Sequence, residues 1–448
     1  MTRGQKYRIM KEYTIAIELG SSKIVAIAGS RDDKGTLTVE AIEEESVTNI
    51  IKRGCVQNIE DVYSYVKRLK TKLENRLSPA KITATYVGIG GVSVFAEDKT
   101  TSKTFHEDSI ITQAHVDKLK EECRALVSSA TDVLAIVPVK YIINGSAVEN
   151  PIGATGTNIE VHYKVLTAKP VLRRNIYRSF VERLHLNIAG HLPTALTTAN
   201  VILTDDERAL GCVLVDFGAE TTTVSIYKNN ALVWLETLPM GGRNITRDIA
   251  SLNLIDNEAE HLKIASGMAK GFKSENNVRL KFEGDGMVEI DLAKLSSVVE
   301  ARSEEIMANV EEQIKRAGLS RKDLTAGVIV VGGAAKLRGW MDLLEDRIGM
   351  KARFATLRKE IQVVEKERSR VNDYLQAVGL LYAAQEVCTK AAAPVFSEES
   401  EDTEEVKEPE TPKTETDLPP KTGLLQMLRK KFNNFINEGE TEEEKNED

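Results

Sequence analysis

A carboxylate, a glycine and three threonines follow one another at the end of an apolar run in the middle of the chain. Residues 211–215 form the run, and Asp216, Gly218 and the threonines at 221–223 come next, before a second apolar run. This pattern predicts a buried strand, a tight turn and a returning strand. Backbone N–H groups in such a turn can converge on an anion, and the carboxylate can hold the water shell of a magnesium ion. Taken alone, the residues fit equally well a core hairpin whose aspartate caps the turn.

The same pattern occurs a second time near the N-terminus. An apolar run at 13–17 ends in Glu18, small polar residues fill 20–22, and Lys23 precedes the next apolar run. The lysine supplies a positive charge suited to a phosphate oxygen. Two hairpins of one design in two halves of a chain predict two related lobes that face each other across a cleft.

Two further glycine turns belong with these hairpins. Gly332 and Gly333 follow a third apolar strand, and bare glycines allow a flat ring to lie against the backbone. We expect a helix to begin directly after them. At Gly241-Gly242 a turn leads into another predicted helix, whose N-terminus would present free N–H groups to an anion.

In this order, the turns resemble the two phosphate loops and the adenosine motif of the actin-like ATPase superfamily. From about residue 13 to about residue 386 the chain resembles the FtsA family, bacterial division proteins that tether the tubulin-like FtsZ to the membrane. Glu18 stands where actin has an aspartate. FtsA proteins commonly carry a glutamate there, so this difference favours the FtsA family and argues against fast hydrolysis.

The resemblance implies that ATP and magnesium bind between the lobes. The residues expected to contact the nucleotide are Gly20, Ser21, Ser22, Lys23, Gly218, Ala219, Thr221, Thr222, Gly242, Glu260, Lys263, Gly332, Gly333 and Ala334. Asp216 and Glu18 are expected at the hydrated metal. By spacing alone, Glu260 and Lys263 fit a solvated pair on one helical face, and the resemblance instead places them at the ribose. No catalytic residue is assigned, and the expectation is a slow ATPase at most, not a metabolic kinase.

The fold implied by the resemblance is α/β and actin-like, with two ribonuclease H-like lobes around the nucleotide cleft and an inserted subdomain 1C. The expected segments are 1–83 (subdomain 1A, first part), 84–166 (1C), 167–200 (1A, continued), 201–244 (2A, first part), 245–318 (2B), 319–370 (2A, continued) and 371–390 (closing helix of 1A). The family implies that the FtsZ C-terminal tail docks on 2B near Arg302, and that 1C contacts neighbouring subunits of a filament and other division proteins.

Apolar spacing predicts individual elements within these segments. Helices are expected at 59–77 with Asn58 as the cap and from Asp291 to about residue 315. In the region of 1C, the pattern predicts strands at 83–89, 92–96, 133–136, 140–143 and 161–167 and a helix at 112–127.

Beyond the closing helix the composition changes sharply. Residues 391–420 are rich in Glu, Pro and Thr, which is typical of a disordered linker. The segment 421–437 then has an amphipathic helical pattern, and 438–448 is acidic. The apolar face comprises Leu424, Leu425, Leu428, Phe432, Phe435 and Ile436, and the basic residues on or beside the other face are Arg429, Lys430 and Lys431.

Such a helix, isolated beyond a linker, favours adsorption to an anionic membrane surface. The alternative is docking in a partner's groove. FtsA proteins end in a membrane-targeting helix, which supports the first interpretation. The acidic run 438–448 would oppose adsorption, so the anchor is expected to be modest, regulated or dependent on several subunits.

Global composition agrees with a soluble intracellular protein, and the resemblance implies a peripheral position on the cytoplasmic side of the membrane, at the division site. The 448 residues are 42% hydrophobic and 29% charged, as in globular proteins, and the net charge of −8 argues against a general nucleic-acid surface. Four widely spaced cysteines argue against disulfides and zinc and fit a reducing compartment. The alternatives are a pilus-assembly ATPase of the same subfamily and a small-molecule kinase of the superfamily; an Hsp70-like chaperone would need a substrate domain after residue 387.

Overall fold

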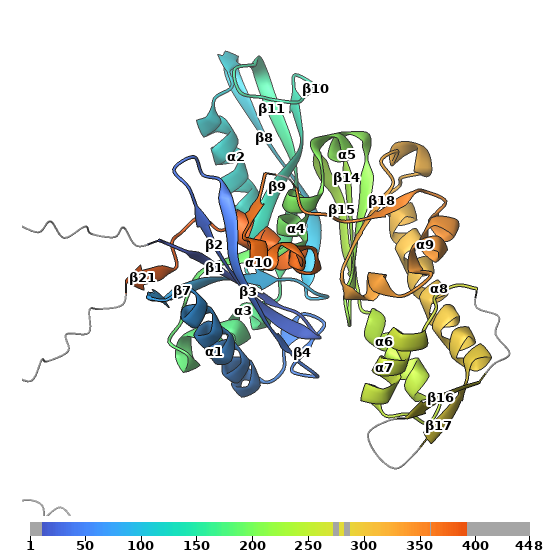
Figure 1. The fold of residues 1–448 in the computed structure, drawn as a ribbon. Coiled ribbons are helices and arrows are strands. Elements are labelled where there is room, and N and C mark those ends of the chain that lie inside the picture. The colour runs from blue at the N-terminus through green and yellow to red at the C-terminus, as the bar shows by residue number, and fades with distance from the viewer. Residues whose placement is uncertain (1–10, 272–276, 282–286, 359, 392–448) are drawn as a thin grey trace, which may run out of the picture. The chain divides into compact units, whose positions relative to one another are not determined.

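The computed structural model describes residues 11–271, 277–281, 287–358 and 360–391. Figure 1 shows two large sheets, each with its own helices, and a smaller sheet carrying α2. We call the two large units lobe 1 and lobe 2. Among the described residues, no helix combines the length and the apolar composition needed to cross a bilayer.

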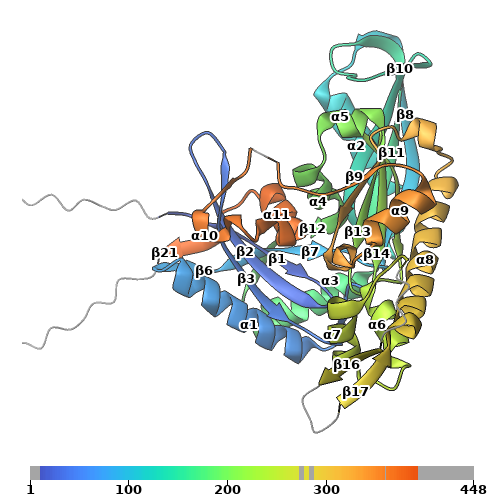
Figure 2. The same cartoon turned by 45° about the vertical axis from the view of Figure 1, so that its right-hand side comes forward.

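Lobe 1 is built on a six-stranded sheet in the order β12-β7-β1-β2-β3-β20. Its strands are β1 (Thr14–Leu19), β2 (Lys23–Arg31), β3 (Leu37–Ser46), β7 (Ala84–Ile89), β12 (Asn187–Pro193) and β20 (Gln362–Val363). Strands β1 to β3 are antiparallel, and β7 and β12 run parallel to β1 on its other side. Helix α1 (Ile59–Arg76) packs on β2 and β3, and α11 (Leu375–Ala383) packs on β1 and β2. The two helices lie on opposite faces of the sheet (Figure 2), and residues 24–30 of β2 are accordingly buried without a break.

Lobe 2 repeats this topology. Its sheet has the order β15-β14-β13-β18-β19. The strands are β13 (Cys212–Phe217), β14 (Thr222–Lys228), β15 (Ala231–Leu238), β18 (Val328–Val331) and β19 (Ala352–Phe354). Three antiparallel strands are again followed by two parallel ones, so β3-β2-β1-β7-β12 corresponds to β15-β14-β13-β18-β19. The two similar hairpins in the sequence therefore belong to two lobes with the same sheet topology. The predicted two-lobed α/β architecture is confirmed.

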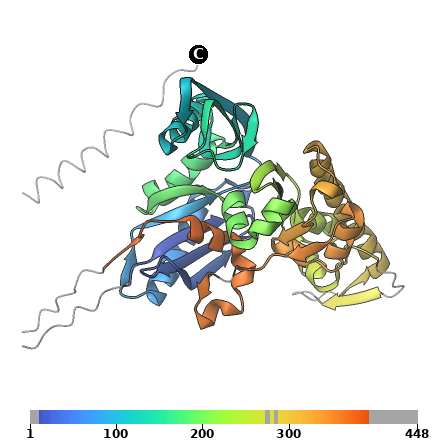
Figure 3. The same ribbon diagram turned by 90° about the horizontal axis from the view of Figure 1, so that it is seen from above.

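A separate four-stranded sheet is inserted between β7 and α3 of lobe 1. Its order is β10-β9-β11-β8, with β8 (Val94–Ile110), β9 (Asp132–Ile143), β10 (Ser146–Val148), β11 (Thr155–Ala168) and α2 (Gln113–Ala125). Leu119 and Cys123 of α2 are fully buried in an apolar cluster that belongs to this sheet. Seen from above, the insertion forms a group of its own (Figure 3). Strand β8 is far longer than the predicted 92–96, and β9 is one strand where two were expected.

Helices of lobe 2 surround its sheet and extend beyond it. They are α6 (Gly242–Ala250), α7 (Asp256–Ser266), α8 (Leu292–Arg316) and α9 (Trp340–Ile348), with the hairpin β16 (Asn277–Lys281) and β17 (Met287–Asp291) before α8. The Asp291 side chain accepts hydrogen bonds from the Ala293 and Lys294 amides, and Asn58 caps α1 in the same way. Both predicted caps are confirmed.

The remaining elements connect the lobes or edge them. They are β4 (Ile51–Lys52), β5 (Cys55–Val56), β6 (Ala80–Ile82), α3 (Pro170–Tyr177), η1 (Arg178–Arg183), α4 (Thr194–Ile202), α5 (Asp205–Leu210), η2 (Arg321–Asp323), η3 (Gly333–Lys336), α10 (Glu365–Arg368), η4 (Val371–Tyr374) and β21 (Thr389–Ala391). The closing segment of lobe 1 is a 3-10 turn, η4, followed by α11, rather than one continuous helix.

Candidate functional site

The N-terminal acid-tipped turn, which we call turn 1 (residues 18–23), joins β1 to β2. A Cβ built on Gly20 would lie 2.7 Å from the Lys23 carbonyl oxygen, so the turn closes too tightly for a side chain. Burial, reinforced by the nearby charge of Asp216 and opposed by Lys23, raises the pKa of Glu18 to about 7. The Lys23 ammonium lies 3.3 Å from a Glu44 carboxylate oxygen.

Turn 2 (residues 216–222) occupies the same place in lobe 2, between β13 and β14. Burial raises the pKa of Asp216 to about 6, opposed by a hydrogen bond from the Gln376 amide at 3.1 Å. Gln376 lies in α11 of lobe 1, so this bond joins the lobes. The Gly218 N–H donates to the Thr221 carbonyl at 2.9 Å and closes the turn.

Two expectations at turn 2 are not met. Thr222 is fully buried and its hydroxyl donates to the Met240 carbonyl at 2.9 Å, so its side chain does not face the space between the lobes. The Gly242 N–H donates to the Gly218 carbonyl at 3.0 Å, and the next amide donates to the Ala219 carbonyl. The first amides of α6 are thus hydrogen-bonded to carbonyls of turn 2. The prediction that the Gly242 N–H is free to bind an anion is therefore wrong.

The third glycine turn follows β18. Gly332 has φ of +99°, and a Cβ there would lie 2.3 Å from the Phe217 carbonyl oxygen and 2.6 Å from the Asp216 carboxylate. Glycine is required at 332 because this turn packs directly against turn 2. At Gly333, by contrast, an added Cβ would meet no heavy atom within 4 Å. The predicted helix does not begin here: a 3-10 turn covers 333–336 and α9 begins at Trp340.

Glu260 and Lys263 of α7 form a hydrogen-bond network with Gly242 and Thr246 of α6. The Lys263 ammonium donates to the Glu260 carboxylate at 2.7 Å, to the Thr246 hydroxyl at 2.9 Å and to the Gly242 carbonyl at 3.1 Å. The Thr246 hydroxyl also bonds Glu260. The Lys263 side chain is 11% exposed, and burial lowers its pKa. Lys263 is therefore enclosed and fully hydrogen-bonded, whereas the Glu260 side chain is 43% exposed.

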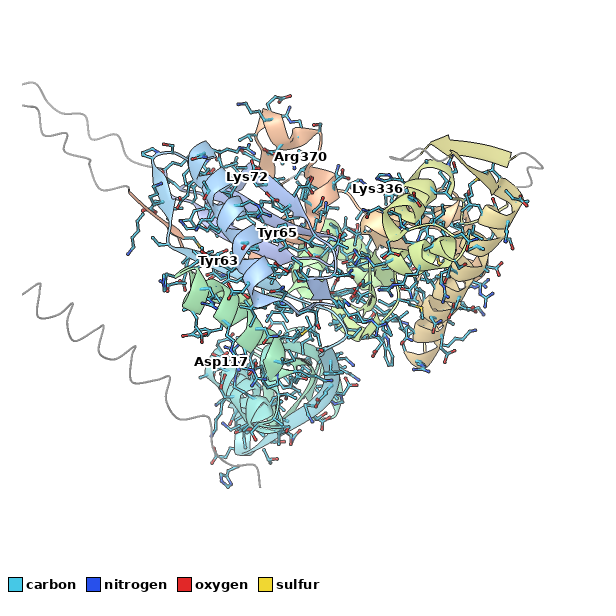
Figure 4. The ribbon with its side chains drawn as sticks, turned by 90° about the horizontal axis from the view of Figure 1, so that it is seen from below. Tyr63, Tyr65, Lys72, Asp117, Lys336 and Arg370 are labelled. Carbon is cyan, nitrogen blue, oxygen red and sulfur yellow. The ribbon has the colours of Figure 1, made fainter. Side chains whose placement is uncertain are left out.

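Turn 1, turn 2 and the glycine turn at 332–333 all face one cavity of about 820 Å³. With the exception of Thr222, every residue expected at the nucleotide or the metal lines it. Lys336 of lobe 2 and Asp373 of lobe 1 both line the cavity and pair at 2.6 Å; Figure 4 labels Lys336 and, near it in this view, Arg370, which directly precedes η4. Arg243 and Gln376 also line the cavity, and sequence reasoning assigned them no role. Gln376 gives no local signal because its contact is 160 positions away in the chain.

Other expected sites lie elsewhere. Arg302, on α8, pairs with Asp248 at 2.5 Å and with Glu305, away from the cavity. The linker 391–420 except its first residue, the amphipathic segment 421–437 and the acidic tail 438–448 lie outside the described residues.

The duplicated sheets and the cleft between them define an actin-like ATPase fold. A solved structure of similar fold is the PilM–PilN type IV pilus biogenesis complex, with a TM-score of 0.60 at 14% sequence identity, covering 83% of this chain and 98% of that one. This likeness concerns the fold alone.

The particular family follows from sequence relatives. The family model "Cell division protein FtsA" matches residues 213–379, and "SHS2 domain inserted in FTSA" matches residues 92–167. FtsA of Porphyromonas gingivalis is 32% identical over 378 residues, which cover 83% of this chain and 78% of that protein. FtsA of Escherichia coli strain K12 is 25% identical over 342 residues, covering 73% and 80%. The chain belongs to the FtsA family of cell division proteins, which decides against a pilus-assembly relative.

Proposed function

We propose that this division protein binds ATP with magnesium between its lobes, polymerises at the inner face of the cytoplasmic membrane and anchors FtsZ filaments there. One observation carries the proposal: two acid-tipped turns from duplicated lobes, together with a glycine turn, line a single cavity. Nucleotide binding would set lobe closure and thereby the contacts between subunits.

The residues of the cavity fit a magnesium nucleotide. The pKa of Glu18 and that of Asp216 are both raised, because burial disfavours their negative charge. A divalent cation with its water shell would stabilise the charged form of both carboxylates in the cavity. Bound magnesium would neutralise charge on the phosphates. Turns 1 and 2 would hold the phosphates, Glu260 and Lys263 the ribose, and the turn at Gly333 the adenine side. No side chain is assigned as a general base, so turnover is expected to be slow.

Gly333 offers the sharpest test of the nucleotide site, because its Cα faces open space and a side chain there should leave the fold intact. Gly333→Phe would project a ring into the cavity, whereas Gly333→Ala adds one methyl group. We expect calorimetric titration with ATP and magnesium to show binding to the wild type and to the alanine variant, and a loss of roughly 100-fold or more for phenylalanine. ATP affinity of the phenylalanine variant within threefold of the wild type would count against this site.

The membrane tether rests on segment 421–437, and its test is sedimentation with anionic vesicles. The full chain should sediment and a chain ending at residue 420 should not. Leu428→Asp with Phe432→Asp is the matched control, because it keeps the length and the basic residues while removing apolar anchors. Removal of the acidic tail alone should strengthen adsorption, since that tail repels anionic lipid. Equal sedimentation of the full and shortened chains would refute the tether.

FtsZ docking is proposed on subdomain 2B, at the face that carries Arg302. The Arg302 guanidinium is engaged by Asp248 and Glu305, and its side chain is 27% exposed, so an acidic tail would compete with these carboxylates. We expect Arg302→Ala to weaken binding of an FtsZ tail peptide without changing ATP affinity. Subdomain 1C, whose sheet begins at β8 because residues 84–89 form β7 of lobe 1, is proposed to contact neighbouring subunits and other division proteins.

A further inference from the structure

Arg243 lies at the start of α6 and reaches from lobe 2 toward lobe 1. Its side chain is 17% exposed and lines the cavity. The guanidinium donates to the Glu220 carboxylate of turn 2, to the Ser21 carbonyl of turn 1 and to the Asn49 side chain. Arg243 is therefore a cation located between the two turns that face the cavity.

All three contacts of this guanidinium are long. Each measures 3.4 Å between donor and acceptor, whereas N–H···O hydrogen bonds are usually 2.7–3.2 Å. Arginine prefers charged acceptors at short, often paired distances. The guanidinium is thus held loosely in its present position, with donor capacity left for an anion between the turns.

Glu220 does not depend on Arg243 for its charge balance. This carboxylate is 5% exposed, but it also pairs with Arg247 at 3.4 Å and accepts the backbone N–H of Arg53 at 3.1 Å. Movement of Arg243 toward an anion would therefore leave Glu220 paired. Arg247 also borders the cavity, but it is 48% exposed, and among the described residues its guanidinium bonds to Glu220 alone, without a contact to turn 1.

The residues around the cavity indicate which end of the proposed nucleotide would lie near Arg243. Glu260 and Lys263 lie at the ribose end, and turns 1 and 2 lie at the phosphate end of the proposed nucleotide. The terminal phosphate, which distinguishes a triphosphate from a diphosphate, would lie between the turns within the region that Arg243 spans. We propose that Arg243 binds this terminal phosphate and makes the site prefer a nucleoside triphosphate to a diphosphate. The inference rests on the proposed nucleotide function and specifies how that site tells its ligands apart.

The test compares ATP and ADP affinities, each with magnesium, for the full chain and three variants. Arg243→Gln should weaken ATP at least tenfold, which corresponds to about 1.4 kcal/mol, and leave ADP within about twofold. Arg243→Lys should keep part of the preference, because it retains a point charge without the paired donors. Arg247→Gln is the matched control and should keep the ATP-to-ADP ratio, and the thermal unfolding midpoint of each variant reports on the fold.

The outcomes separate the two levels of the proposal. Equal weakening of ATP and ADP by Arg243→Gln would assign the arginine to cleft geometry and overturn the inference, as would no change in either affinity. A loss of the ratio in Arg247→Gln as large as in Arg243→Gln would also overturn it. A wild-type chain that binds neither nucleotide would refute the nucleotide function itself.

Discussion

Turns 1 and 2 have the same topology but different chemistry. Each joins the first two strands of its sheet and each carries an acid before the glycine. Turn 1 contains its own cation, Lys23, which lies beside Glu44 and 4.1 Å from the centre of the Tyr374 ring. Turn 2 contains an acid, Glu220, and its cations come from α6.

This difference teaches which parts of the site the duplication supplies. The repeat delivers the features that follow from strand geometry: an acid at the strand end and a glycine that closes the turn. The balancing charges are supplied separately in each lobe, within the turn in lobe 1 and from the following helix in lobe 2. The two acids also differ, because Glu18 has the higher pKa and Asp216 is bonded to Gln376.

The largest expected effect separates the two acids as metal partners. Asp216→Asn should lower magnesium-dependent ATP affinity by roughly 100-fold, and Glu18→Gln by about tenfold, because the Gln376 hydrogen bond favours the charged form of Asp216, whereas burial and the charge of Asp216 both favour the protonated form of Glu18. Titration with ATP at fixed magnesium measures both losses. A larger loss of ATP affinity for Glu18→Gln than for Asp216→Asn would contradict the prediction that Asp216 contributes more to metal binding.

A second prediction concerns stability without nucleotide or metal. In the unfolded chain Glu18 loses its proton near its ordinary value of 4.5, whereas in the folded chain it keeps the proton to about 7. Between these values the folded state binds more protons, so the free energy of unfolding falls as pH rises. Glu18→Gln should therefore raise the free energy of unfolding at pH 8 by on the order of 2–3 kcal/mol, with a smaller gain at pH 5. Urea unfolding at the two pH values measures this, and equal gains at both would contradict it.

The smallest effect concerns the cation of turn 1. The Lys23 side chain is 34% exposed, and partly exposed ion pairs contribute about 0–1 kcal/mol to stability. Lys23→Ala should leave urea unfolding nearly unchanged while ATP affinity falls about tenfold, the loss expected for one charge-assisted hydrogen bond. A destabilisation larger than the loss of binding would make Lys23 a structural residue.

Local signals in the sequence predicted the parts of the fold that local physics decides. The acid, the glycine and the returning strand of each turn lie within a few residues, as do the caps at Asn58 and Asp291. Strand β8 was underestimated because its distal half is polar and is held as a strand by pairing with β11, which lies about 50 residues away.

The rest of the site depends on tertiary contacts that no short pattern contains. The amide of Gly242 is engaged because turn 2 packs on α6, and Thr222 turns toward Met240 for the same reason. Gln376 reaches Asp216 because the closing helix of lobe 1 passes beside lobe 2. The residues that line the cavity are therefore more predictable from the sequence than the hydrogen bonds among them.

The most direct measurement is a crystal structure of the complex with ATP and manganese, read by the anomalous signal of the metal. We expect one manganese ion in the cavity beside Asp216 and Glu18, with the phosphates between Gly20 and Gly218. Nucleotide bound elsewhere on the chain, or a cavity closed by side chains at millimolar ATP, would contradict the claim that the two turns hold one triphosphate.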